Sequence, residues 1–145
     1  MPDNRGMKNL SPKEAWAWLQ AEQARRQASG QDGPLFVDVR MEIESLYVGR
    51  PPGVENIPWY EYPDLTPHPE QFVKLVEAEV AEKAVPVLLI CRSGKRTLDA
   101  GLALEAAGYT DVYNVLHGFE GELNDQFHRS MVNGWRFDGL PWEQL

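Results

Sequence analysis

The residue with the clearest chemical potential in this 145-residue chain is Cys91, its single cysteine. An apolar run of strand length, residues 87–90, leads directly into it, and a Leu/Ala-rich helical pattern begins near Thr97. Cys91 is therefore predicted to lie at a strand-to-helix turn. In a parallel α/β sheet such a turn is at the carboxyl end of the strands, where ligands bind.

The turn that follows the cysteine is strongly cationic. It carries Arg92, Lys95 and Arg96, in a chain whose net charge is −8. Its backbone N–H groups run into a helix N-terminus, which attracts anions. Nearby cations and a helix N-terminus favour the thiolate, which is the nucleophilic form of cysteine. We therefore expect Cys91 to be an activated nucleophile.

The spacing within this turn separates three kinds of loop. A phosphate-binding Walker loop requires glycine five residues before its Gly-Lys pair, but that position is Leu89. A cysteine phosphatase loop has one residue more between its cysteine and arginine than the four that separate Cys91 from Arg96. The shorter loop from Cys91 to Arg96 encloses a smaller space, which fits a single sulfur atom on Cys91 better than a phosphoryl group.

A second charged pair ends another apolar run, LFVDVR at residues 35–40. We expect this run to form a strand beside residues 87–90, which would place Asp38 and Arg40 near the mouth of the same cleft. Arg40 would bind substrate or another loop, and Asp38 would fix the arginine or cap local amides. A structural ion pair and a shell around the active site are equally compatible with such a pair.

The other elements follow from capping signals and periodicity. Ser11 as N-cap and Glu14 as its capping-box partner predict a helix that runs to about Gln27. The remaining expectations are an irregular N-terminal arm (1–10), short strands (54–57 and 111–115), a helix (70–83) burying Phe72, Leu75, Val76 and Val80, a last helical segment opening at 118–121, and a Trp-rich tail (133–142) that packs on the body.

Composition excludes several classes of protein. The length fits one domain, and the negative charge argues against nucleic acid or an anionic membrane surface as a partner. A single cysteine excludes an internal disulfide. The chain has no apolar stretch of transmembrane length and no N-terminal leader pattern, so a cytoplasmic location is expected. The three histidines have no metal-ligand spacing and are expected to be surface or packing residues. Four acidic residues, Glu42, Glu44, Glu55 and Glu61, are expected to form a solvated acidic face.

Six segments, in order, resemble the rhodanese (thiosulfate sulfurtransferase) family in its single-domain form. They are LFVDVR (35–40), PGVENIPW (52–59), CRSGKR (91–96) with Thr97 after it, AGY (107–109), VYNVLHGFEG (112–121) and GLPW (139–142). The resemblance implies a single rhodanese-like α/β domain over residues 11–145, with a central, mostly parallel five-stranded sheet flanked by helices on both faces. One departure is His117-Gly118, where the family usually has Gly-Gly.

The resemblance also implies a chemistry, in which Cys91 alternates between thiolate and persulfide. By similarity, the substrate-binding residues are Arg92, Ser93, Gly94, Lys95, Arg96, Thr97 and Arg40, with Asp38 in the surrounding shell. A small anionic donor such as thiosulfate or glutathione persulfide would supply sulfur, and cyanide, a thiol or an acceptor protein would take it. No metal or organic cofactor is implied. The alternatives are a non-catalytic or regulatory rhodanese module that binds a partner or senses persulfide or oxidant, and a phosphatase or arsenate reductase on the same fold.

Overall fold

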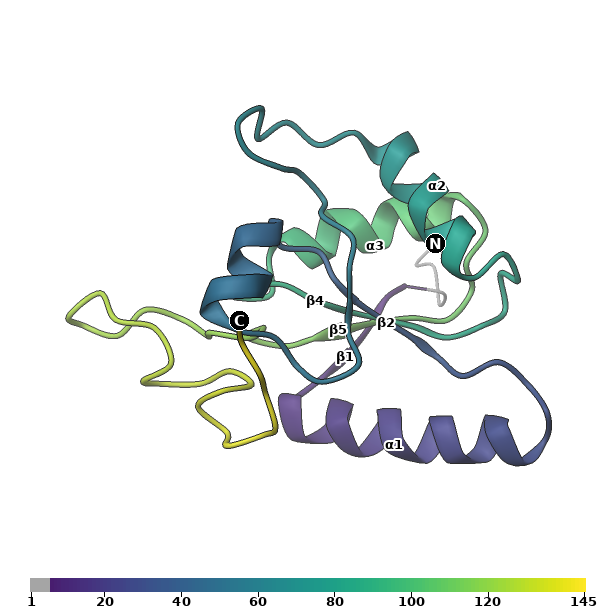
Figure 1. Ribbon diagram of the computed structural model, residues 1–145, viewed down its shortest axis with the longest axis horizontal. Helices are drawn as coiled ribbons and strands as arrows, with labels where there is room; N and C mark the ends of the chain where they lie inside the picture. Colours follow the sequence, from purple (N-terminus) through teal and green to yellow (C-terminus); the bar gives the residue numbers. More distant parts are fainter. Residues whose placement is uncertain (1–5) are drawn as a thin grey trace.

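Five parallel strands form one sheet in the order β1-β5-β4-β2-β3 (Figure 1). The computed structural model describes residues 6–145. The strands are β1 (Lys8–Leu10), β2 (Leu35–Asp38), β3 (Glu55–Asn56), β4 (Val87–Ile90) and β5 (Val112–Val115). β4 is the central strand, and all four of its residues are buried. A continuous apolar run of this kind is typical of a strand covered on both faces.

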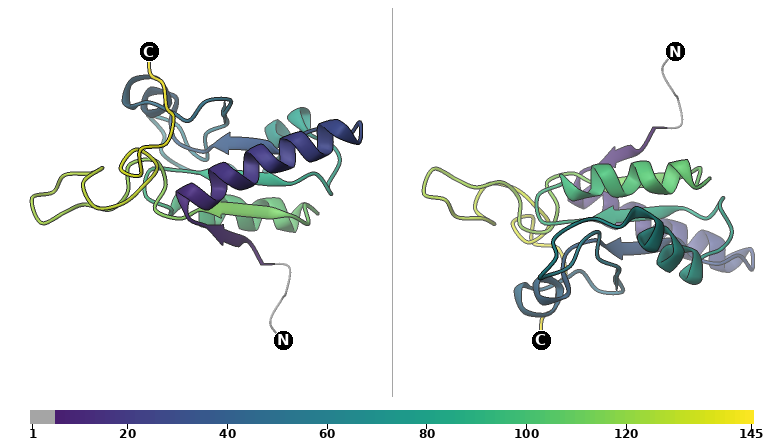
Figure 2. Two further views of the ribbon diagram at one scale, coloured as in Figure 1. Left: turned by 90° about the horizontal axis from the view of Figure 1, so that it is seen from below. Right: turned by 90° about the horizontal axis from the view of Figure 1, so that it is seen from above.

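Helices cover both faces of the sheet (Figures 1 and 2). α1 (Pro12–Ala28) packs on one face, and α2 (Pro69–Glu79) and α3 (Arg96–Ala106) pack on the other. Successive β4 side chains alternate between the two cores, because a strand has a period of two. Val87 and Leu89 join the core under α2 and α3, while Leu88 and Ile90 join the core under α1. The predicted fold class is confirmed.

The start of α1 is set by its capping box, as predicted. The Ser11 side chain accepts from the Glu14 amide at 3.2 Å, and the Glu14 carboxylate accepts from the Ser11 amide at 2.8 Å. Two otherwise unpaired amides are thereby satisfied. The helix phase that results buries Ala15 and Leu19 against the sheet.

The order of the strands predicts a crevice at the carboxyl ends of β2 and β4. β2 and β4 are neighbours, with Asp38 paired to Ile90 at their carboxyl ends. The chain continues from β2 to β3 on one side and from β4 to β5 on the other. Such a reversal leaves a crevice outside the carboxyl ends of the two strands, where ligands bind in open α/β sheets. Cys91 directly follows β4 at this point.

The N-terminal segment differs from the irregular arm expected over residues 1–10. Residues 8–10 form β1, an edge strand that pairs in parallel with β5. The Asn114 side-chain amide donates to the Asn9 Oδ1 at 3.0 Å, so polar side chains support this pairing. Residues 1–5 of the predicted arm lie outside the described residues.

Two helix predictions are corrected. α2 ends at Glu79 rather than at Lys83, and Leu75, expected in its buried stripe, is 53% exposed. Residues 118–121 form turns instead of opening a helix. Gly118 and Gly121 have left-handed φ values of +61° and +77°, which a right-handed helix does not contain. The amides of Phe119, Glu120 and Gly121 donate to the Cys91 and Arg92 carbonyls instead.

The C-terminal tail packs on the domain as expected. Trp135 is fully buried, with its ring 5.7 Å from Trp16 and 5.8 Å from Phe36. Its indole N–H donates to the Pro141 carbonyl at 2.7 Å. Trp142 is 41% exposed and stacks edge-on against Phe119. Within residues 6–145, no helix combines the length and the apolar character that crossing a membrane requires.

Candidate active site

Cys91 lies where the sequence predicts, at the end of the central strand and beneath a short loop. Residues 92–95 form bends, and α3 begins at Arg96, one residue before the expected start. The Gly94 amide donates to the Cys91 sulfur at 3.1 Å, and the Thr97 hydroxyl lies 3.7 Å from it. The loop therefore curls around the sulfur and directs a backbone donor at it. Cys91 itself is only 1% exposed.

Two glycines give this loop its shape. Gly94 has a φ of +92°, a left-handed conformation that favours glycine. Gly118 has a φ of +61°, and a Cβ at this position would collide with the Cys91 carbonyl oxygen. The turn after β5 can approach the cysteine loop only because this residue has no side chain. His117, at the first position of the usual Gly-Gly pair, adopts a left-handed φ of +67° with a side chain.

Substituting Gly118 tests this close approach. We expect Gly118→Ala to destabilise the fold by more than the roughly 1–2 kcal/mol of left-handed strain alone, because the new methyl also displaces the Cys91 carbonyl. Gly53→Ala is the matched control, since Gly53 has a φ of +75° and nothing within 4 Å of its Cβ position. Urea unfolding measures both variants. If Gly118→Ala and Gly53→Ala lose the same free energy of unfolding, the close contact between Gly118 and the Cys91 carbonyl does not contribute to stability.

Arg96, predicted to bind substrate, is already paired. Its guanidinium forms two hydrogen bonds with the Glu44 carboxylate, at 2.8 and 3.0 Å, and lies 5.2 Å from the centre of the Tyr60 ring. Both side chains of the ion pair are 12% exposed. Glu44 was expected on a solvated acidic face, and that expectation is wrong. It lies in a π-helical segment, residues Glu44–Val48, that faces the cysteine loop.

The ion pair shifts the titration of both partners. Burial acts to raise the pKa of the Glu44 carboxyl, but the hydrogen bonds and charge of Arg96 hold that pKa below its ordinary value of 4.5. Burial acts to lower the pKa of the Arg96 guanidinium, and the Glu44 pair raises it above its ordinary range. Both groups are therefore charged at neutral pH, and Glu44 compensates most of the Arg96 charge.

The Glu44 pKa predicts a pH dependence of stability. The unfolded carboxyl takes up its proton around 4.5, whereas the folded one stays ionised to lower pH. The pair therefore stabilises the fold fully above about pH 4.5 and contributes less as pH falls through the folded-state pKa. Replacing Glu44 with glutamine should lower the free energy of unfolding at pH 7, and the deficit should shrink in acid. The exposed Glu42→Gln variant is the control. A deficit that stays constant with pH would contradict this account.

A cavity of ≈ 290 Å³ opens beside the cysteine loop. Its charged and aromatic lining comprises Glu44, Tyr60, Arg92, Arg96, Glu120 and Arg129. Of these, only Arg92 and Arg96 were predicted as site residues. Lys95 is exposed on the loop and Ser93 is half-buried, but neither lines this cavity.

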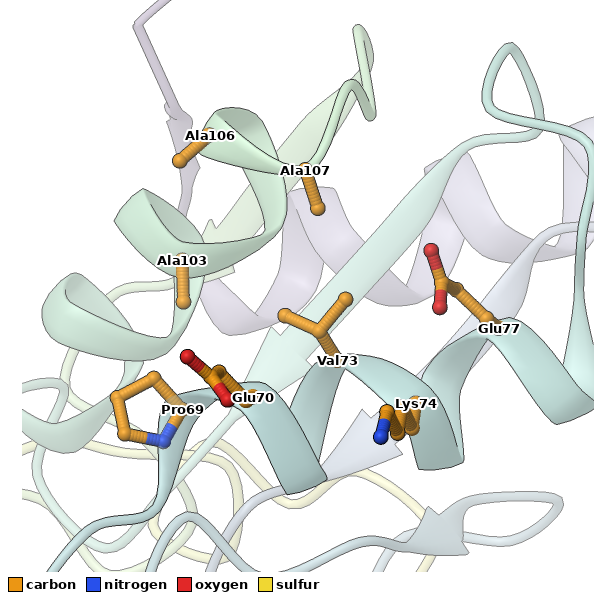
Figure 3. Close-up of a pocket in the computed structure, with 8 residues that line it drawn as sticks. All are labelled: Pro69, Glu70, Val73, Lys74, Glu77, Ala103, Ala106 and Ala107. Carbon is orange, nitrogen blue, oxygen red and sulfur yellow. The ribbon is translucent and has the colours of Figure 1, made fainter.

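A larger hollow, of ≈ 450 Å³, lies between α2 and α3 (Figure 3). Its apolar wall is formed by Val73 of α2, Ala103 of α3 and Ala107, which directly follows α3. Glu70 and Lys74 lie at its rim. None of the predicted site residues lines it. We therefore place the candidate active site at Cys91 and its cationic loop rather than at the larger hollow.

The structure corrects the substrate-binding role expected of Arg40. Both Arg40 and Asp38 are 0% exposed, so neither side chain reaches the cavity. Arg40 donates to both Asp38 carboxylate oxygens, at 2.9 and 2.7 Å, and to the Gly49 carbonyl at 2.6 Å. Its guanidinium also lies 4.8 Å from the centre of the Phe119 ring. Asp38 fixes the arginine, as one of the two readings proposed, and the pair is structural.

Comparisons with known proteins agree with this arrangement. The family described as Rhodanese-like domain matches residues 11–124, so the chain belongs to the rhodanese-like family. The uncharacterized protein RC0915 of Rickettsia conorii is 30% identical over 118 residues, which cover 77% of this chain and 85% of that protein.

Solved structures show the same fold. The crystal structure of Rv0390 from M. tuberculosis superposes with a TM-score of 0.80 at 34% identity, over 97% of this chain and 99% of that one. Thiosulfate sulfurtransferase from Pseudomonas aeruginosa superposes with a TM-score of 0.63 at 19% identity, over 95% of this chain and 20% of that one. The second likeness is one of fold alone.

Proposed function

We propose that the protein is a sulfurtransferase that carries sulfane sulfur as a persulfide on Cys91. The observation that carries the proposal is the Gly94 amide directed at the Cys91 sulfur, within a loop that ends at the N-terminus of α3. No side chain caps that helix end, so its first amides add to the positive field around the sulfur. This environment suits a thiolate nucleophile.

The proposed reaction has two displacements. The Cys91 thiolate attacks the outer sulfur of thiosulfate, a new S–S bond forms, the thiosulfate S–S bond breaks, and sulfite leaves with its electron pair. An acceptor such as cyanide then attacks the outer persulfide sulfur, forms thiocyanate and returns the thiolate. A persulfide donor reacts in the same way and releases a thiolate. The electrons balance without an added oxidant or reductant.

The loop contributes electrostatic stabilisation. The Gly94 amide stabilises negative charge on the cysteine before attack and on the persulfide after it. In comparable anion sites, the loss of one such donor costs about 3–4 kcal/mol of transition-state stabilisation. Thr97 places a hydroxyl 3.7 Å from the same sulfur and adds a second polar contact.

A second candidate is a rhodanese module that binds a partner without turnover. The near-complete burial of Cys91 favours it, because a donor must reach the thiol. Against it, the sulfur receives a directed donor and adjoins a cationic loop, which an inert cysteine does not require. The fold is also that of a protein named as a thiosulfate sulfurtransferase.

Steady-state kinetics test the proposal. We expect thiocyanate formation from thiosulfate or glutathione persulfide and cyanide, with the parallel-line pattern of a reaction that passes through a covalent intermediate. A phosphotyrosine mimic should not be hydrolysed. Hydrolysis of the mimic without sulfur transfer would favour phosphatase chemistry, and the absence of both activities would favour the binding module.

A further inference from the structure

We propose that Arg129, together with Arg92, binds the anionic group of the sulfur donor. Arg129 lies beyond residues 11–124, where the rhodanese-like match ends, and it lines the cavity beside the cysteine loop. The inference rests on the proposed function and adds a specificity-determining residue to it.

The first step concerns the charge already in the cavity. Glu44 forms two hydrogen bonds with Arg96, so the arginine that ends the cysteine loop has its charge compensated. In the part of the chain that the structure describes, neither Arg92 nor Arg129 forms an ion pair. Arg92 and Arg129 are therefore the two lining arginines that are available to pair with an anion.

The second step concerns position. The Arg129 guanidinium donates to the Gly121 carbonyl at 2.7 Å, and the Gly121 amide donates to the Arg92 carbonyl at 3.1 Å. A single residue thus links Arg129 to the backbone of the cysteine loop. Because the partner of Arg129 is a neutral carbonyl, its positive charge remains available to a ligand. Its other N–H groups remain to bind an oxyanion.

The third step concerns rigidity, which a binding residue needs. Next to Arg129, the Ser130 hydroxyl accepts two hydrogen bonds from Arg136, at 2.8 and 3.2 Å. Arg136 also donates to the Val48 carbonyl at 3.0 Å, and its guanidinium lies over both the Phe119 and Trp142 rings. The C-terminal tail therefore holds the segment that carries Arg129 against the cavity.

Glu120 also lines the cavity, and its carboxylate weakens the preference of the cavity for anionic donors. It places a carboxylate near the two free arginines and lowers their pull on any anion. Removing its charge should strengthen the binding of anionic donors, whereas removing the charge of Arg129 should weaken it. Opposite effects from two lining residues are the signature of an electrostatic anion site.

Alkylation of Cys91 gives a direct test that does not depend on turnover. Iodoacetate and iodoacetamide react at the same carbon with the same leaving group, and only iodoacetate carries a carboxylate. We expect Arg129→Gln to lower the ratio of the iodoacetate rate to the iodoacetamide rate about 10- to 100-fold, as loss of a charge-assisted hydrogen bond predicts. Arg129→Lys keeps the positive charge and should lower this ratio less than Arg129→Gln does. Glu120→Gln removes a negative charge and should raise the ratio.

Arg25→Gln is the matched control. It removes the same charge from the last turn of α1, and it should leave the ratio unchanged. With sulfur donors, Arg129→Gln should raise KM for thiosulfate by a similar factor and leave KM for a persulfide with an uncharged organic part unchanged. Equal losses with both donors, or an unchanged alkylation ratio, would overturn the inference. Failure of the proposed function has a separate signature, because wild-type Cys91 would then accept sulfur from neither donor.

Discussion

Replacing Cys91 with serine is expected to abolish sulfur transfer from thiosulfate to cyanide while leaving the fold intact. Serine is slightly smaller than cysteine and can still accept the hydrogen bond from the Gly94 amide, so the loop keeps its shape. Its hydroxyl cannot form the persulfide that both displacements require. Loss of a covalent nucleophile lowers kcat by on the order of 10⁴-fold or more.

The control for this variant is Thr66→Ala, which removes an exposed hydroxyl outside the cysteine loop. It should retain most of the activity, and both variants should unfold near the wild-type urea midpoint. A serine variant that transfers sulfur at a rate comparable to that of the wild type would remove Cys91 from the mechanism. A variant that loses both activity and cooperative unfolding would show a structural role instead.

The second large effect is expected at the buried pair of Asp38 and Arg40. Replacing Arg40 with methionine leaves the Asp38 carboxylate fully buried and without its guanidinium partner. Such an uncompensated charge destabilises a fold by about 3–5 kcal/mol. We expect Arg40→Met to lose this much free energy of unfolding at pH 7, measured by urea denaturation.

The double variant Asp38→Leu, Arg40→Met is the informative comparison. It removes both charges and places two apolar side chains in a site bordered by Phe119. Because replacing a buried pair with apolar residues is often close to neutral, the double variant should be more stable than Arg40→Met alone. If the double variant loses as much free energy of unfolding as Asp38→Leu and Arg40→Met lose together, the two side chains do not stabilise the fold as a pair.

The central unit of the fold could be predicted from the sequence because its signals are local. The apolar run before Cys91, the cations after it and the capping box at Ser11 each fix a structure over a few residues. The order of the segments that resemble the rhodanese family then implied the sheet. These features specify the strand end at which the nucleophile sits.

Local signals failed where distant hydrogen bonds decide the structure. β1 is a polar edge strand without apolar alternation, so residues 8–10 resembled an irregular arm. The segment 118–121 was expected to open a helix, but Gly118 and Gly121 adopt left-handed φ values and the amides of 119–121 bond to the distant Cys91 and Arg92 carbonyls. The need for glycine at position 118 arises because the turn after β5 lies against the Cys91 carbonyl in the folded structure. Such a contact between distant segments cannot be predicted from the spacing of residues in the sequence.

The candidate site was predicted in part for the same reason. Cys91 and the loop cations are contiguous in sequence and were found, whereas Glu44 lies 52 residues before its partner Arg96. Arg129 lies between the family segments 112–121 and 139–142, in a stretch that no motif covers, and its hydrogen bond to the Gly121 carbonyl helps to place it at the cavity. The sequence left two roles open for Arg40, because a strand-end arginine can turn toward a buried carboxylate or toward the crevice, and the structure shows the first.

The most direct test of the persulfide account is the intact mass of the protein after incubation with thiosulfate, and again after cyanide is added. The account predicts a gain of one sulfur atom, located on Cys91 by peptide mapping, and its complete removal by cyanide with formation of an equivalent amount of thiocyanate. The Cys91→Ser variant should gain nothing. An unchanged mass with thiosulfate and with glutathione persulfide would contradict the account.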